Sequence, residues 1–102
     1  MGVTALQAAS MNGYAGIVLE LLDRNANVDA PGANHGGRTA LEGAAEHGRL
    51  DVVQILLNAG AQLSGSGQQQ YERAIALSSK EGYHAVKRLI WKCAGHDQVN
   101  RC

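Results

Sequence analysis

Four residues near the carboxyl end of the sequence have side chains that can bind a metal ion: His84, Cys93, His96 and Cys102. Two residues separate Cys93 from His96, a spacing that zinc ligands use, and a structural zinc ion needs four such ligands in a tetrahedron. However, Gly95 breaks the helix between them, and Cys102 is the last residue given. Since firm zinc motifs hold their ligands in fixed pairs, we expect no metal and no cofactor.

Nucleophilic catalysis and phosphate binding are two further chemistries to consider. The sequence has no Gly-x-Ser-x-Gly elbow, which would expose a serine at a sharp turn. Cys93 and His96 could form a thiol–base pair, but no third group is placed to orient the base. Gly36-Gly37-Arg38-Thr39 could offer N–H groups to an anion, yet it lacks the Walker lysine and a preceding strand. The sequence therefore predicts that the chain is not an enzyme.

Composition fits one soluble globular domain of 102 residues, 45% of them hydrophobic and 18% charged. The formal net charge of zero argues against a nucleic-acid-binding or anionic-membrane surface. No apolar run is long enough to cross a bilayer. Two cysteines are too few for a disulfide framework. We therefore expect no nucleic acid and no membrane as partners, and an intracellular, cytoplasmic setting.

The net charge of zero is the sum of two opposite parts. Residues 1–63 carry three basic and six acidic side chains, whereas residues 64–102 carry six basic and three acidic ones, which gives −3 and +3. This split is either a polarised docking surface or an accident of composition, because most charges only solvate a surface.

An internal repeat supplies the elements that position these side chains. The pattern recurs at an offset of 35 residues and then, more weakly, at an offset of 34. The matched segments are Thr4-Ala5-Leu6 with Thr39-Ala40-Leu41, Gly13 with Gly48 and Gly82, Val18 with Val53, and Ile55-Leu56 with Leu89-Ile90. A fixed period of this length is typical of repeat architectures.

Each copy is predicted to form two short helices. In the second copy Thr39 is suited to cap the first helix, and Gly48 is suited to end it. The second helix, from about Asp51 to Asn58, carries Val, Ile and Leu at i, i+3 and i+4, which form one apolar stripe. One such pair cannot bury its stripe alone, so neighbouring pairs must stack. We expect an all-α protein.

The second copy resembles an ankyrin repeat. Residues 37–61 read Gly-Arg-Thr-Ala-Leu-Glu-Gly-Ala-Ala-Glu-His-Gly-Arg-Leu-Asp-Val-Val-Gln-Ile-Leu-Leu-Asn-Ala-Gly-Ala, close to the family's run of Thr-Pro-Leu-His, two alanines, Gly, a Val/Leu-rich helix and Gly-Ala. Gly-Gly-Arg-Thr-Ala-Leu also resembles ankyrin segments of large fungal multidomain proteins. The resemblance covers about residues 2–94. It implies a solenoid of stacked helix–turn–helix pairs with protruding turns.

The resemblance divides the single domain into repeats at about residues 2–33, 34–67 and 68–94, followed by a tail at 95–102. The Gly/Pro/Asn cluster at 30–38 predicts a protruding, hairpin-like turn, and the Ser/Gly/Gln cluster at 64–70 predicts a loop. In the third copy Lys87 replaces the valine of the earlier copies, as suits a last layer that faces water. Trp91 of that copy is expected to close the core.

Departures from the family pattern affect the turn and the first copy. The motif histidine is replaced by Gln7 and Glu42, so we expect the side-chain network at the turn to be weakened. The first copy keeps apolar residues such as Val3, Ile17 and Val18, which are expected to face outward as well as inward. We therefore expect this end to continue a longer array, to be covered by a partner, or to lack a thin upstream cap.

The resemblance implies binding of another protein through the turn tips and the concave face of the first helices. The positions concerned are His35 and Arg38 in the turn, Glu42, Glu46 and His47 on the following helix, and Gln7, Met11 and Asn12 in the first copy. The alternative is self-association, in which an uncapped N-terminal repeat stacks on another copy and makes a homo-oligomer. The charge split would favour such head-to-tail contact.

Overall fold

The computed structural model describes residues 3–33 and 36–96. These residues form six α-helices and no strand, which confirms the all-α prediction. The helices are α1 Ala5–Asn12, α2 Ala15–Asp23, α3 Ala40–Glu46, α4 Leu50–Asn58, α5 Gln68–Glu81 and α6 His84–Trp91; a 3-10 turn, Gly65–Gly67, precedes α5, and a π turn, Lys92–His96, follows α6.

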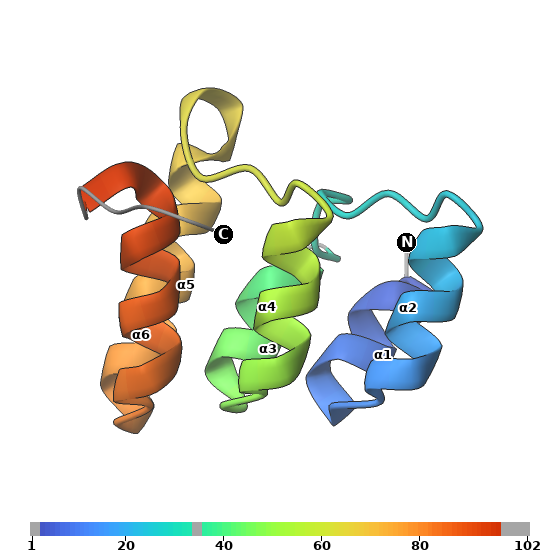
Figure 1. The fold of residues 1–102 in the computed structure, drawn as a ribbon, viewed down its shortest axis with the longest axis horizontal. Coiled ribbons are helices and arrows are strands. Elements are labelled where there is room, and N and C mark those ends of the chain that lie inside the picture. Colours follow the sequence, from blue (N-terminus) through green and yellow to red (C-terminus); the bar gives the residue numbers. More distant parts are fainter. Residues whose placement is uncertain (1–2, 34–35, 97–102) are drawn as a thin grey trace.

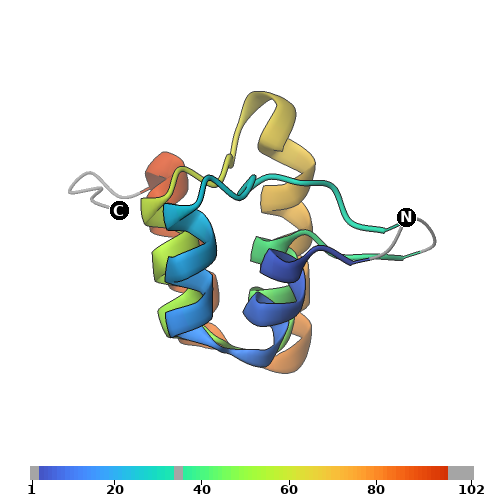
Figure 2. The same ribbon diagram turned by 90° about the vertical axis from the view of Figure 1, so that its right-hand side faces the viewer.

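The helices form three hairpin-like pairs that stand side by side along the long axis (Figure 1). The first helices of the pairs, α1, α3 and α5, make one layer, and α2, α4 and α6 make the other (Figure 2). Such an arrangement is the stacked solenoid of helix–turn–helix pairs that the repeat predicts.

A continuous apolar seam runs through the second helices. Val18 of α2 and Val53 of α4 have no exposed surface, because each faces the pair that follows. Lys87 occupies the equivalent position of α6 and is exposed. Among the described residues, the position that holds a buried valine in the first two pairs therefore holds an uncovered lysine in the third.

Two threonine capping boxes start the first helices of the first two pairs. The Thr4 hydroxyl accepts the N–H of Gln7 at 3.1 Å, and Gln7 Oε1 accepts the N–H of Thr4 at 3.0 Å. Thr39 and Glu42 repeat this arrangement at 3.2 and 3.1 Å. Each box satisfies two N–H groups that a helix start leaves unpaired, as the sequence predicts for Thr39.

Each pair is locked to the next through a glycine turn. Gly13 and Gly48 adopt the left-handed conformation, with φ of 75° and 68°. A Cβ added at Gly13 would lie 2.9 Å from Arg49 Cδ, and one added at Gly48 would lie 2.7 Å from the Tyr83 ring. Arg49 Nε also donates to the Met11 carbonyl at 3.0 Å. The residues before α4 and α6, Arg49 and Tyr83, thus rest on the turn of the preceding pair.

The third pair differs from the prediction at its start. The helix α5 begins at Gln68, so the second half of the expected 64–70 loop is helical, and α5 has 14 residues against eight in α1. No proline or glycine interrupts residues 68–72, and Gln68 Nε2 donates to Glu72 Oε2 at 3.0 Å across one helical turn. Side-chain pairs at this spacing support a helix.

Two apolar residues at the ends of the stack lie elsewhere than expected. Trp91 is 44% exposed and does not close the core, because Val86 and Ile90 take the side of α6 that faces the body of the protein. In the first pair Val3 and Ile17 are exposed as predicted, whereas Val18 is fully buried against α4. Val18 is buried, contrary to the prediction, because its side chain faces the next pair of helices.

Candidate protein-binding face

The inner face is defined here as the exposed side of α1, α3 and α5 together with the turn that joins α2 to α3. The turn projects beyond the first helices on the side away from α2 and α4 (Figure 2). Its two arms touch through their backbones: Gly37 N–H donates to the Ala33 carbonyl at 2.9 Å, and a Cβ on Gly37 would lie 2.2 Å from Ala33 N. Only glycine permits this approach, so the described arms of the turn lie directly against each other.

The base of the turn is held by Gln7. Its Nε2 donates to the carbonyls of Ala30 and Pro31 at 3.0 and 2.9 Å, and the side chain is 1% exposed. We expected the side-chain network at this turn to be weakened, but Gln7 maintains it. One end of its amide accepts a hydrogen bond in the capping box, and the other end donates to the loop. The turn is therefore fixed on the first pair of helices.

Burial removes two residues from the predicted contact set. Gln7 at 1% and Glu42 at 2% exposure are both committed to capping boxes inside the fold. Their polar character suggested an exposed position. Inside the fold, however, their polar atoms form hydrogen bonds with the N–H groups of the helix starts and, for Gln7, with the turn carbonyls. The expectation that a partner reads these two side chains is corrected accordingly.

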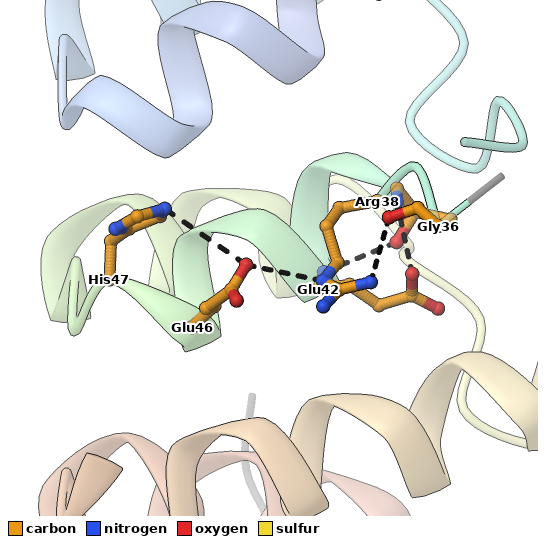
Figure 3. A network of polar contacts seen from close by, with 6 residues as sticks. Gly36, Arg38, Glu42, Glu46 and His47 are labelled. Carbon is orange, nitrogen blue, oxygen red and sulfur yellow. Dashed lines mark hydrogen bonds and ion pairs between the residues drawn. The ribbon is translucent and has the colours of Figure 1, made fainter. Parts of the chain in front are cut away.

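Three of the predicted residues form one row along α3, with Arg38 in the turn before the helix, Glu46 at its last position and His47 at its C-cap; this is called the Arg38–His47 row. Arg38 Nε donates to Glu46 Oε1 at 3.1 Å, and Arg38 Nη1 donates to the Gly36 carbonyl at 2.9 Å (Figure 3). His47 Nε2 lies 4.0 Å from the same Glu46 oxygen. The side chains of Arg38, Glu46 and His47 are 30%, 28% and 44% exposed.

The side chains of the row are held in place, but the ion pair between them is weak. The Arg38–Glu46 pair is partly exposed, and such pairs contribute only about 0–1 kcal/mol to stability. An arriving carboxylate can therefore replace Glu46 on Arg38 at small cost, and a guanidinium or amine can replace Arg38 on Glu46. The arrangement suits exchange with a partner's charges.

Met11 and Asn12 lie beside the row on the neighbouring helix α1. Met11 is half-buried and lies over α3, since a Cβ on Gly43 would lie 2.5 Å from Met11 Cγ. Asn12 is exposed, and its Nδ2 donates to the Ala8 carbonyl at 2.9 Å. His35 falls outside the described residues. The structure thus places five predicted residues on one face.

A polar hollow of about 520 Å³ lies between the turn and α5. Arg38 of the turn and Arg73 of α5 both line it. So does Gln70, which is 7% exposed: its Nε2 donates to Asp29 Oδ1 and to the Gln62 carbonyl, and its Oε1 has no hydrogen-bond partner within residues 3–33 and 36–96. Arg73 was not predicted as a contact, because the repeat offset of 34 matches it to the capping Thr39, whereas α5 starts five residues before Arg73.

Only two of the four residues considered as metal ligands, His84 and Cys93, have side chains that the structure describes. Cys102 and the side chain of His96 lie outside the described residues, and no three His, Cys, Asp or Glu side chains gather around a common point among the residues that the structure covers. Over the same residues, every helix is too short or too polar to traverse a bilayer.

Comparison with known proteins places this geometry in a family. A family model described as ankyrin repeats (3 copies) matches residues 1–66. From Mus musculus, ankyrin repeat and SAM domain-containing protein 6 is 34% identical over 89 residues, B-cell lymphoma 3 protein homolog 40% over 81, and protein fem-1 homolog A-like 31% over 99. The matches cover 87%, 79% and 97% of this chain but only 9%, 17% and 15% of those proteins.

Proposed function

This chain belongs to the ankyrin-repeat family, and we propose that it binds another protein through its inner face. Ankyrin repeats are generally modules for interaction between proteins. The observation that carries the proposal is the Arg38–His47 row, in which an arginine, a glutamate and a histidine are partly exposed on a rigid support (Figure 3). The binding residues proposed are Arg38, Glu46, His47, Met11 and Asn12, together with His35 from its place in the sequence.

The turn and helix that carry the row are rigid, and this rigidity favours binding. The turn is fixed by Gln7 at its base and by backbone contact between its arms. A face that is already ordered loses little conformational entropy when a partner docks. Met11 adds a flexible apolar contact beside the charges. Polar groups around an adaptable apolar residue are a common pattern for protein recognition.

The test exchanges the charges of the row without breaking its internal pair. In the double variant Arg38→Glu, Glu46→Lys, the two positions still attract one another, but the pattern presented to a partner is reversed. The matched control is Glu20→Lys, Arg24→Glu, which exchanges the exposed ion pair of α2, 2.8 Å in length, on the outer layer. Circular dichroism checks that both variants keep the helical fold.

Affinity capture followed by mass spectrometry then compares wild type, variant and control. We expect the wild type and the α2 control to retain the same partner and the inner-face variant to lose it. An unchanged partner in all three samples would show that the inner face is not the binding surface.

A second candidate function is self-association through the first pair. Ile17 is 52% exposed, whereas its equivalents Val52 and Val86 are buried against the preceding pair. Tyr14, 56% exposed, is the equivalent of Arg49 and Tyr83, which both rest on a preceding turn. A second copy could supply the missing layer. Sedimentation across a range of concentrations tests this, and a monomer at every concentration would remove it.

A further inference from the structure

A groove of about 930 Å³ lies between α4 and α6 in the outer layer, away from the inner face. Apolar side chains make its floor: Leu50 of α4, and Ala85 and Leu89 of α6. Leu50 is 43% exposed, while Leu89 packs against the core. An exposed leucine in a concave site offers apolar surface that a binding partner can bury.

A basic stripe borders this floor on one side. His84, Arg88 and Lys92 line the groove and follow one another at intervals of four residues. Lys92 keeps helical backbone angles, with φ −63° and ψ −44°, so the helical path continues through it. Residues four apart on a helix lie on one side, about 6 Å from each other along the axis. Arg88 and Lys92, which are permanently charged, therefore lie with His84 on one side of the helical path.

The cations of this stripe are uncommitted within the described chain. The ion pairs there involve Arg24, Arg38 and His47, and none involves Arg88 or Lys92. Asp51 is the acidic residue that lines the groove, from the α4 side, and its Oδ1 accepts the N–H of Val52 at 2.8 Å. Two permanent positive charges thus stand beside an apolar floor without an internal partner.

Helix stacking does not require this charge. At the positions of His84, Arg88 and Lys92, α2 carries Ala15, Leu19 and Asp23. The hollow between α2 and α4 is lined by Leu19 and Asp23 and has about 350 Å³. The stripe is therefore a property of one groove and not of the repeat.

We propose that the groove between α4 and α6 docks an acidic amphipathic helix of another protein. Apolar side chains of that helix lie on Leu50 and Leu89, and its carboxylates, placed every four residues, stand opposite Arg88 and Lys92 at the same 6 Å interval. Nucleic acid fits less well, because the floor is apolar and only two permanent positive charges face the groove.

The probe is a synthetic helix-forming peptide of about four turns, with glutamates along one stripe and leucines along the adjacent stripe. A matched peptide carries glutamine for each glutamate. We expect binding of the first peptide that weakens as salt is raised, and at least about tenfold weaker binding of the second, measured by fluorescence anisotropy.

Variants of the protein locate the site. Arg88→Glu, Lys92→Glu should weaken binding of the acidic peptide by about tenfold or more. Lys87→Glu is the control: the side chain is exposed on the same helix, lies outside the groove, and should change binding less than about twofold. Leu50→Ser should also weaken binding, since it removes apolar floor at an exposed position where the fold tolerates it.

Three results would overturn the proposal. The first is no binding of the acidic peptide at about 1 mM. The second is equal loss in the Lys87 control and the groove variant, which would show nonspecific charge attraction. The third is preference for phosphatidylserine vesicles or duplex DNA over the peptide, with the same dependence on Arg88 and Lys92. The inner-face capture experiment is independent of all three.

Discussion

Substitution of Gly48 by alanine tests how closely successive pairs of helices are packed. Gly48 has a φ of 68°, and the added Cβ would lie 2.7 Å from the Tyr83 ring of the next pair. Gly82 is its equivalent in the third pair, with a φ of 78° and open space around the added Cβ. The two substitutions therefore share the backbone strain, while only the first meets a neighbouring layer.

The magnitudes follow from these two terms. An L-residue in the left-handed conformation costs about 1–2 kcal/mol, which is the whole expected cost of Gly82→Ala. Gly48→Ala must also displace the Tyr83 ring, and crowding of this kind costs about 1–3 kcal/mol. Since Tyr83 is 38% exposed and can swing outward, we expect the lower part of that range. Gly48→Ala should therefore destabilise by about 1–2 kcal/mol more than Gly82→Ala.

Urea unfolding followed by circular dichroism measures both free energies of unfolding. In a Tyr83→Ala background the excess cost of Gly48→Ala should disappear, because the ring that the new Cβ meets is gone. Equal costs for Gly48→Ala and Gly82→Ala in the wild-type background, within about 0.5 kcal/mol, would refute the close contact between the turn and Tyr83.

Four further substitutions test the supports of the inner face and the direction of stacking. Thr39→Ala removes a capping box and should lower the free energy of unfolding by about 1 kcal/mol; an unchanged urea midpoint would contradict it. Gln7→Ala removes the hydrogen-bond donor of two turn carbonyls and should lower the free energy of unfolding by about 1–3 kcal/mol. The turn should then be cleaved faster by protease; cleavage at the wild-type rate would contradict the role of Gln7 in holding the turn. Val53→Ala opens a cavity and should cost about 2 kcal/mol or more, whereas Lys87→Ala at the equivalent exposed position should stay within about 0.5 kcal/mol; similar losses would mean that Lys87 also lies in an interface.

The sequence predicts most of the helical framework because the determinants are local and repeated. A threonine cap, a glycine end and a Val/Leu stripe recur at a nearly constant period, so each copy supports the interpretation of the others. Lys87 in place of valine was enough to indicate which pair is last among the described residues. The start of α5 was missed because Ser-Gly-Ser-Gly at 64–67 resembles a loop and hides the helix-compatible residues from Gln68 onward.

The inner face was predictable in outline but not in its contacts. Residue type alone suggested that Gln7 and Glu42 lie on the surface, while their burial depends on partners in the helix start and, for Gln7, in a turn 23 residues away. The pair of Arg38 with Glu46 joins a turn arm to the end of a helix, and its geometry depends on how the turn folds back. Such long-range polar contacts leave no periodic mark in a sequence.

Site-specific photocrosslinking tests the proposed binding face most directly. A benzoylphenylalanine is placed at His47 on the inner face in one sample and at Glu20 on the outer layer in another; their side chains are 44% and 59% exposed. We predict that the captured partner crosslinks from position 47 and not from position 20. A partner that crosslinks from position 20 and not from position 47 would contradict the assignment of the inner face.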